Sequence, residues 1–279
     1  MIKYMVIGDP IAHSRSPGMQ NAAFEFHGLG SPYGIRHVRP DELGGFIEFA
    51  RANLKGVNLT VPHKAAVIPY LDTVDPAAEA AGSVNTLIIE NGRIHGASTD
   101  GYGLEHALLE NFSRPLAGAG VTFIGAGGAA HATAFHLAAL GVKAIRIANR
   151  TVAKADEIAE KLRLHPALFV ETARPDDSAT LARWFADTDF LIQATSLGLK
   201  AGDPAPFDLA LLKPELKLCI FDTIYKPTPL LAKARELRLP VADGAAMLIH
   251  QGAKSFELWT GLSAPLDAMR RGFLEAQPC

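Results

Sequence analysis

The stretch VTFIGAGGAA, residues 121–130, decides the fold that the rest of the chain must extend. Its apolar run VTFI is typical of a buried strand, and the small residues that follow are typical of a tight turn into a helix. Gly125, Gly127 and Ala130 form the pattern G-x-G-x-x-A at this turn. Such a turn lets the backbone approach a pyrophosphate, which unpaired N–H groups at the helix N-terminus bind. The stretch therefore predicts the beginning of a dinucleotide-binding domain.

Alternating elements follow the turn and extend it into a sheet. We expect a helix over residues 129–140, a strand over 144–149 and a second helix over 153–162. Short apolar runs bounded by turn residues predict further strands at 169–171, 190–194 and 218–222. Strands that alternate with helices favour a parallel sheet. The glycines alone leave one alternative open, in which the turn is tight but binds no ligand.

The rest of the chain shows the same alternation. In its first third, the patterns predict strands at 4–7, 56–59 and 85–89 and helices at 18–27 and 41–52. Toward the C-terminus, they predict a helix at 230–236, a short strand at 240–242 and helices at 245–261 and 265–275. We therefore predict an α/β protein with two α/β domains. The boundaries are expected in short connections near Asp100–Glu105 and near Asp243.

Length, charge and cysteine usage limit the class of protein. A chain of 279 residues is long for one hydrophobic core, which supports two domains. The formal net charge of −2 argues against nucleic acid as a partner. The N-terminal apolar run is too short for a signal peptide and no stretch reaches about 18 apolar residues, so we expect a cytoplasmic protein without a membrane partner. Cys219 and Cys279 are too few for a disulfide framework or a cysteine metal site, and no metal is expected.

The residues after the strand at 144–149 indicate which dinucleotide binds. An acidic residue at this point would accept the ribose 2′-hydroxyl of NAD, but this chain has Asn149, Arg150 and Thr151, with Lys154 one turn further on. An acid would repel a 2′-phosphate, whereas Arg150 and Lys154 would attract it. We therefore predict NADP as the cofactor. The alternative is that these basic side chains only form a solvated surface.

Polar side chains also interrupt two segments in the first third of the chain. In GDPIAHSRSP, residues 8–17, Ser14 and Ser16 follow the first strand, where loops of parallel sheets commonly bind ligands. Serine is also a common helix cap, so both interpretations stay open. In GVNLTVPHK, residues 56–64, Thr60 alternates with apolar positions and Lys64 follows a proline. A lysine in such a place is ordinarily a solvated surface residue.

Two further segments place an amide and a carboxylate near strand ends. Asn85 interrupts the apolar run of GSVNTL, and Asp100 stands before Gly101 in GASTDG. A lone carboxylate in a turn is normally a cap. Together with Lys64, however, Asp100 suits an alcohol dehydrogenase, because hydride transfer to NADP oxidises an alcohol only if another group removes the hydroxyl proton. A pair of a lysine and an aspartate is one chemical answer to this requirement.

These segments and several others resemble the shikimate dehydrogenase family over nearly the whole chain. The order and spacing of the shared motifs make the resemblance specific. The motifs are GDPIAHSRSP (8–17), GVNLTVPHK (56–64), GSVNTL (82–87), STDG (98–101), GAGGAA (125–130), NRT with Lys154 (149–151), ATSLG (194–198), FDTIYKPTPLL (221–231) and GAAMLIHQGAKSFELWTG (244–261).

The resemblance implies an NADP-dependent interconversion of shikimate, a small cyclic hydroxy acid, and 3-dehydroshikimate. It implies a substrate domain of residues 1–101 and 244–279, and a Rossmann-type NADP-binding domain of residues 102–243, with the active site in the cleft between them. Ser14 and Ser16 would hold the substrate carboxylate, and Lys64 would relay the hydroxyl proton beside Asp100. The residues implied around the ring and its hydroxyls are Thr60, Asn85, Tyr225 and Gln251. Those implied at the cofactor are Gly125, Ala126, Gly127, Gly128, Ala129, Asn149, Arg150, Thr151, Lys154, Thr223 and Gly244.

Some positions depart from the usual pattern of the family. They are Gln20, Ser98, Gln193, Ala245 and Ala246. None of them removes the catalytic pair, but a changed polar side chain beside a site loop alters substrate preference and turnover. Three alternatives therefore stay open: quinate as the substrate, an aminated relative of shikimate as the substrate, and a regulatory protein that binds both ligands without useful turnover. The chain is expected to be a monomer or a homodimer.

Overall fold

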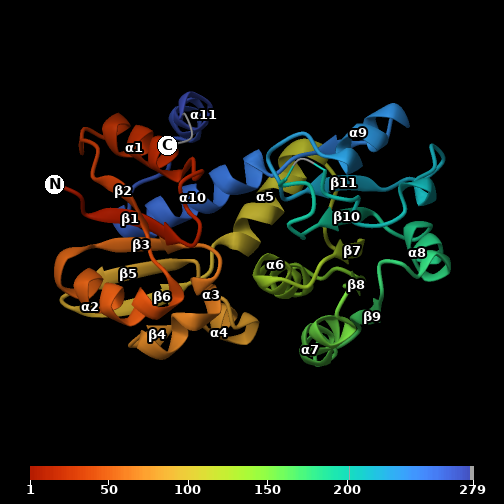
Figure 1. The fold of residues 1–279 in the computed structure, drawn as a ribbon, viewed down its shortest axis with the longest axis horizontal. Coiled ribbons are helices and arrows are strands. Elements are labelled where there is room, and N and C mark those ends of the chain that lie inside the picture. The colour runs from red at the N-terminus through yellow and green to blue at the C-terminus, as the bar shows by residue number, and fades with distance from the viewer. Residues whose placement is uncertain (201, 277–279) are drawn as a thin grey trace. The chain divides into compact units, whose positions relative to one another are not determined.

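The structure, a computed structural model, describes residues 1–200 and 202–276. The chain divides into two compact units. The first unit contains Met1–Gly103 and the chain from Leu248 onward, and the second contains Leu104–Met247. Each unit has its own six-stranded sheet with helices packed against it (Figure 1). The prediction of an α/β protein with two α/β domains is confirmed.

The first unit is built on a mixed sheet with the strand order β2-β1-β3-β5-β6-β4. Its strands are β1 (Tyr4–Gly8), β2 (Tyr33–His37), β3 (Gly56–Leu59), β4 (Thr73–Val74), β5 (Thr86–Glu90) and β6 (Arg93–Ala97). β2, β1 and β3 are parallel, whereas β5 runs antiparallel to both β3 and β6. Asn91 and Gly92 form the turn between β5 and β6, with φ of 50° and 75°. An Asn-Gly pair favours such a hairpin, because both residues tolerate positive φ.

Helices cover both faces of this first sheet. They are α1 (Ser16–Phe26), α2 (Leu43–Asn53), α3 (His63–Ala66), α4 (Pro76–Ala81), α10 (Ala245–Thr260) and α11 (Leu266–Glu275), with 3-10 turns η1 (Pro40–Glu42) and η2 (Ile68–Tyr70). Successive side chains of β1 point to opposite faces. Ile7 packs in the core with α2, while Tyr4 stacks on Phe24 of α1 and lies against Trp259 of α10.

Two close contacts fix helices within the first unit. α1 and α11 lie side by side (Figure 1), and a methyl group added at Gly18 would lie 2.6 Å from the carbonyl oxygen of Gly272. The Trp259 indole donates a hydrogen bond of 2.9 Å to the carbonyl of Leu87, and its ring covers Gly56, which has no side chain. α10 is therefore anchored directly over β3 and β5.

The second unit is built on an entirely parallel sheet with the strand order β9-β8-β7-β10-β11-β12. Its strands are β7 (Gly120–Ile124), β8 (Ala144–Ala148), β9 (Phe169–Ala173), β10 (Phe190–Gln193), β11 (Cys219–Asp222) and β12 (Val241–Ala242). Numbered from the first strand of the unit, this order is 3-2-1-4-5-6, which is the order of the dinucleotide-binding Rossmann fold. The glycine turn follows the strand at the centre of the sheet.

Two separate cores lie on the faces of the second sheet. One contains side chains of α5 (Asp100–Phe112), α6 (Gly128–Ala139) and α7 (Val152–Leu162). The other contains Trp184 and Phe185 of α8 (Ser178–Phe185) and Leu230 of α9 (Pro229–Glu236). A short 3-10 turn, η3 (Leu209–Leu211), packs at the second core. Helices on both faces explain why most positions of these strands are apolar, although Arg146 interrupts β8 and Glu171 interrupts β9.

A half-buried histidine in α6 is expected to make the stability of this unit sensitive to acid. Nε2 of His131 is buried with no hydrogen-bond partner among the described residues. Burial lowers the pKa of His131, and the positive charge of Lys161 acts in the same direction. The pKa of His131 is lower in the folded protein than in the unfolded chain, where it is about 6.5. The free energy that favours the folded state over a protonated, unfolded chain is therefore fully present above that pH, and it is lost as the pH falls through the folded pKa.

We expect the variant His131→Leu to lose less stability on acidification than the wild type. The reason is that leucine keeps an apolar side chain at this position and has no proton to take up. We would measure Tm at neutral pH and again at a pH about one unit below the ordinary histidine pKa. The fall in Tm between these two pH values should be smaller in the variant than in the wild type. An equal fall in both proteins would show that His131 does not contribute to the acid sensitivity.

Candidate active site

Lys64 and Asp100 form a buried ion pair in the first unit. Lys64 lies in α3, directly after β3 and the segment TVP, and Asp100 is the first residue of α5. Lys64 Nζ lies 2.5 Å from Asp100 Oδ2, and the two side chains are 16% and 6% exposed. The structure thus brings together the two residues predicted as the catalytic pair, one from each side of the β5–β6 hairpin. Asp100 lies at a helix N-terminus, not in a turn outside regular structure as its glycine neighbour had suggested.

Asn85 connects this pair to α10. Its side-chain nitrogen donates to Asp100 Oδ1 at 2.9 Å and lies 3.2 Å from Gln251 Oε1. Its side-chain oxygen accepts the backbone N–H of Thr99 at 2.8 Å. Asn85 itself precedes β5, which begins one residue later than predicted. Four predicted residues, Lys64, Asp100, Asn85 and Gln251, therefore form one cluster.

The hydroxyl groups predicted for the substrate lie in two other loops of the first unit. Ser14 Oγ accepts the backbone N–H of Ser16 at 3.3 Å, and Ser16 is the buried first residue of α1. This contact lies within the local turn, and it is not a helix cap, because the N-cap of α1 is Arg15 and no side chain caps that helix. Thr60 follows β3 and is half-buried. Within the described residues, none of these three hydroxyls has a hydrogen bond to Lys64 or Asp100.

The glycine turn has the geometry that a dinucleotide requires. Gly125 has φ of +113°, and a methyl group added to it would lie 2.8 Å from the carbonyl oxygen of Ala194. Gly127 is the N-cap of α6, and a methyl group at Gly128, the next residue, would meet only open space. The first N–H groups of a helix have no partner within the helix. The turn up to Ala129 therefore leaves donors and space for a pyrophosphate, so the residues present fit the predicted cofactor.

Asn149 ties this turn to the end of β8. Its side-chain oxygen accepts the N–H of Ala126 at 3.2 Å, and its side-chain nitrogen donates to the carbonyl of Thr151 at 2.7 Å. Thr151 is the N-cap of α7 and, like Arg150 and Lys154, is exposed. The basic residues predicted for a 2′-phosphate therefore stand together at the start of α7.

Arg174 is a further basic residue at this edge that the sequence did not suggest. It follows β9, the neighbour of β8, and donates from Nη1 to the carbonyl of Arg150 at 3.3 Å. Its guanidinium also forms a bidentate pair with Asp176, with two distances of 2.9 Å. An Arg so far from the N-R-T motif gives no sequence signal, because only the parallel pairing of β8 and β9 brings the two segments together.

Thr223, Tyr225 and Gly244 lie in loops at the carboxyl ends of β11 and β12. Gly244 packs so closely on the backbone of Thr223 that any side chain there would collide with it. Asp222, the residue before Thr223, is fully buried. It accepts hydrogen bonds from Ile224 N at 3.0 Å and from Thr228 Oγ at 2.7 Å. Burial raises the pKa of Asp222. Its carboxyl group thus holds the loop that carries Thr223 and Tyr225.

The departures from the family pattern have different environments. The side chain of Gln193 is satisfied: it accepts the N–H of Thr195 at 2.5 Å and donates to the carbonyl of Leu197 at 3.0 Å. Gln20 donates to the carbonyl of Gly252 at 2.8 Å, but its Oε1 is buried without a partner among the described residues. Ser98 Oγ is likewise buried without a hydrogen-bond partner among the described residues. Ala245 and Ala246 begin α10, and Ala246 packs against the core of the second unit.

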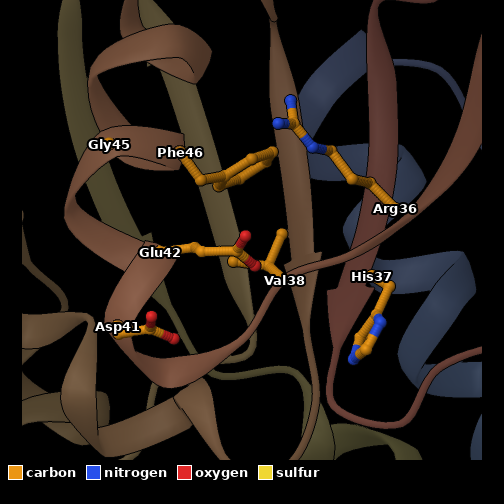
Figure 2. A pocket seen from close by; sticks show the side chains of 7 residues that line it. All are labelled: Arg36, His37, Val38, Asp41, Glu42, Gly45 and Phe46. Carbon is orange, nitrogen blue, oxygen red and sulfur yellow. The ribbon is translucent and has the colours of Figure 1, made fainter.

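A separate pocket of the first unit contains none of the predicted site residues. It is lined by Arg36, His37, Val38, Asp41, Glu42, Gly45 and Phe46 (Figure 2). Most of its charged side chains already pair with neighbours: Glu42 pairs with Arg39, and His37 with Asp9. Arg36 lies over the rings of Phe46 and Phe49.

Residues 1–200 and 202–276 contain no group of three or more His, Cys, Asp or Glu side chains arranged to hold a metal ion. Over the same ranges, no helix combines the length and the apolar character that a membrane crossing requires.

A parallel sheet in the Rossmann order with an open glycine turn, and a buried Lys–Asp pair in the other unit, define a dinucleotide-dependent oxidoreductase. Sequence models of three domains match this chain: the shikimate dehydrogenase substrate binding domain at residues 6–87, shikimate / quinate 5-dehydrogenase at 107–199, and the shikimate 5'-dehydrogenase C-terminal domain at 244–271. The chain belongs to the shikimate dehydrogenase family.

Individual relatives match over almost their full length. The NADP(+) shikimate dehydrogenase of Symbiobacterium thermophilum is 40% identical over 97% of this chain and 93% of its own. The crystal structure of shikimate 5-dehydrogenase from Listeria monocytogenes in complex with shikimate and NAD has 35% identity and a TM-score of 0.89, over 97% of this chain and 96% of that one. The Thermus thermophilus enzyme in complex with NADP(H) and shikimate has 34% identity and a TM-score of 0.86, over 99% and 100%.

Proposed function

We propose that this protein is a shikimate dehydrogenase that interconverts shikimate and 3-dehydroshikimate with NADP as the hydride carrier. The observation that carries the proposal is the buried pair of Lys64 Nζ and Asp100 Oδ2, 2.5 Å apart, in a chain of this family. A buried charge pair is costly to desolvate and is retained most readily where it has a chemical use. Relatives that bind shikimate with NAD or NADP(H) support the choice of ligands.

The proposed mechanism assigns the proton to Lys64. In the direction of oxidation, Lys64 acts as the neutral amine: it takes the proton of the reacting hydroxyl, and Asp100 holds the resulting ammonium by a charge-assisted hydrogen bond. The chemistry that NADP⁺ would supply when bound is acceptance of the hydride from the carbinol carbon. In the reverse direction, the Lys64 ammonium returns the proton to the alkoxide. Asn85 keeps the Asp100 carboxylate in place through its hydrogen bond to Oδ1.

The remaining predicted residues bind the substrate in this proposal. Ser14 and Ser16 hold the substrate carboxylate. Both lie after β1: Ser14 is in the loop that leads to α1, and Ser16 is the first residue of that helix. The residues proposed for the ring and its hydroxyls are Thr60, Asn85, Tyr225 and Gln251. The substrate-binding domain is residues 1–101 with 244–279, and the NADP-binding domain is residues 102–243. The partner is thus a small cyclic hydroxy acid, and the proposal includes a cytoplasmic location and a monomeric or homodimeric state.

The cofactor is held by the turn of the second unit and by the start of α7. We propose that the pyrophosphate binds at the open N-terminus of α6, where Gly127 and Gly128 present backbone N–H groups. Arg150 and Lys154 bind the 2′-phosphate with Asn149 and Thr151 beside them, and Thr223 and Gly244 contact the nicotinamide end.

We expect the wild type to have a higher kcat/KM with NADP⁺ than with NAD⁺, and Arg150→Ala to reduce this preference. A charge-assisted hydrogen bond contributes about 1.5–3 kcal/mol, so kcat/KM with NADP⁺ should fall roughly 10- to 100-fold while the value with NAD⁺ changes little. Arg163→Ala, which removes an exposed arginine at the other end of α7, is the matched control and should alter neither value. Equal use of both cofactors by the wild type would contradict the assignment of NADP.

A substrate panel tests the proposed reaction itself. Purified protein with NADP⁺ and shikimate, quinate or an aminated relative should form the reduced cofactor fastest with shikimate. Quinate is the second candidate, because one matching family model covers both shikimate and quinate dehydrogenases. If the protein turned over quinate faster than shikimate, quinate would be assigned as the substrate in place of shikimate. Binding of both ligands without any NADPH formation would instead indicate a regulatory protein.

A further inference from the structure

The Lys64–Asp100 pair is the end of a longer network of buried polar side chains within the first unit. Beyond Asn85, this network continues across β5, β3 and β2 and reaches α10 on the same face. The six residues of the network beyond the Lys64–Asp100 pair are each at most 6% exposed. They are Tyr33 (2%), Asn58 (6%), Asn85 (2%), Thr86 (0%), Thr99 (1%) and Ser255 (0%).

Hydrogen-bond polarity fixes the orientation of the Asn85 amide. The backbone N–H of Thr99 can only donate, so the Asn85 atom that lies 2.8 Å from it must be the side-chain oxygen. Thr86 Oγ lies 3.0 Å from the same oxygen and can also donate to it. The amide nitrogen must then face Asp100, to which it donates at 2.9 Å. The contacts of the oxygen and those of the nitrogen therefore require the same orientation of the Asn85 amide.

The opposite end of the network is fixed by a phenol. Tyr33 is completely enclosed, and burial raises its pKa well above the ordinary value, so its hydroxyl keeps its proton. Tyr33 Oη donates to Asn58 Oδ1 at 2.7 Å. The Asn58 nitrogen is consequently the donor toward the centre of the network, at 3.0 Å from Ser255 Oγ and 3.2 Å from Thr86 Oγ.

Thr86 lies at the centre of these contacts. Its hydroxyl accepts from Asn58, lies 2.8 Å from Ser255 Oγ, and donates within reach of the Asn85 oxygen. Ser255 Oγ also lies 3.0 Å from the carbonyl of Gln251, so its single proton can go either to that carbonyl or to Thr86 Oγ. When Ser255 donates to Thr86, the Thr86 proton is available for the Asn85 oxygen. Removal of the Thr86 hydroxyl would take away one donor to the Asn85 oxygen, which would keep only its contacts with Thr99 at 2.8 and 3.2 Å. The Asn58 nitrogen would keep Ser255 Oγ and the backbone carbonyl of Asn85 as acceptors.

We propose that Thr86 is a positioning residue for the dehydrogenase reaction: its hydroxyl, held by Asn58 and Ser255, fixes the Asn85 amide and thereby the Asp100 carboxylate beside Lys64. Thr86 touches neither the reacting proton nor the Lys64 ammonium, and it acts only through Asn85. This inference rests on the proposed function, because it presupposes that the geometry of Lys64 and Asp100 limits turnover.

The test compares Thr86→Val, which keeps the branched shape but loses the hydroxyl, with Thr86→Ser, which keeps the hydroxyl. We expect Thr86→Val to lower kcat about tenfold or more, the effect of one buried hydrogen bond, with KM for NADP⁺ unchanged. Thr86→Ser should recover most of kcat. Thr122→Val is the matched control, since Thr122 is a fully buried threonine of the second unit whose hydroxyl pairs with Thr188 at 2.7 Å, and its kcat should equal that of the wild type.

The outcomes distinguish this inference from the proposed function. Wild-type kcat in Thr86→Val, together with an inactive Lys64→Ala variant, would overturn the inference alone, as would an equal loss of kcat in Thr86→Val and Thr86→Ser. Full turnover in Lys64→Ala would overturn the proposed function and the inference with it. If Thr86→Val does not fold, as judged by circular dichroism, Ser255→Ala replaces it, because that variant removes the neighbouring hydroxyl of the same network; wild-type kcat there overturns the inference.

Discussion

Replacing Lys64 with alanine is expected to lower kcat by about 10²–10⁴-fold, the usual contribution of a general acid–base group, while NADP⁺ binding stays close to that of the wild type. The side chain is 16% exposed and its ammonium group faces a carboxylate. Alanine removes the amine that takes the hydroxyl proton and leaves Asp100 without the partner of its Oδ2, while Asn85 still holds Oδ1. The glycine turn that holds the cofactor belongs to the other unit and is unchanged.

Stopped-flow and steady-state measurements of NADPH formation give kcat, and titration with NADP⁺ gives Kd. Lys55→Ala is the matched control, because Lys55 is an exposed lysine directly before β3 in the same unit. Asp100→Ala should resemble Lys64→Ala in kcat. Turnover near the wild-type rate in either variant would remove that residue from the mechanism.

The catalytic pair could be predicted from sequence because each member belongs to a segment with a distinctive pattern. Lys64 ends GVNLTVPHK and Asp100 belongs to STDG, and hydride transfer requires a group of their kind. Their contact could not be predicted from spacing alone. It depends on β3 pairing with β5 and on the Asn-Gly turn that returns the chain through β6 to Asp100.

The supporting residues of the site were missed for a different reason. Thr86, Thr99 and Ser255 are small hydroxyl residues that occur on any protein surface, so their types carry no signal. Ser255 reaches the cluster only because α10 is anchored over β3 and β5 by Trp259. Such contacts join residues 169 positions apart, which no local pattern reveals.

The strands of the second unit were predicted well, since strands buried on both faces are near-continuous apolar runs. β2 and β6 of the first unit were not predicted. β6, with the sequence RIHGA, has one large apolar residue, Ile94, and owes its conformation to pairing with β5. α5 was missed as well because Gly101 and Gly103 disfavour a helix, yet burial of its later apolar side chains overrides that preference.

Replacing Gly125 with alanine is expected to weaken NADP⁺ binding by roughly 100-fold or more. At φ of +113° an L-residue is strained, at a cost of about 1–3 kcal/mol. The added methyl group would also lie 2.8 Å from the carbonyl oxygen of Ala194. That carbonyl cannot move freely, because the N–H of Ala194 continues the β7–β10 ladder with a 2.8 Å hydrogen bond to Ile124.

Relief of this collision must therefore come from the turn itself, which would shift the first N–H groups of α6 away from the pyrophosphate. Gly45→Ala is the matched control, because Gly45 is an exposed helical glycine of α2 and its added methyl group meets open space. That variant should bind NADP⁺ normally and gain up to about 1 kcal/mol of stability. Calorimetric titration with NADP⁺ measures both variants. An unchanged Kd in folded Gly125→Ala would mean that the cofactor does not depend on this turn, since no rearrangement that admits the methyl group leaves the turn where it is.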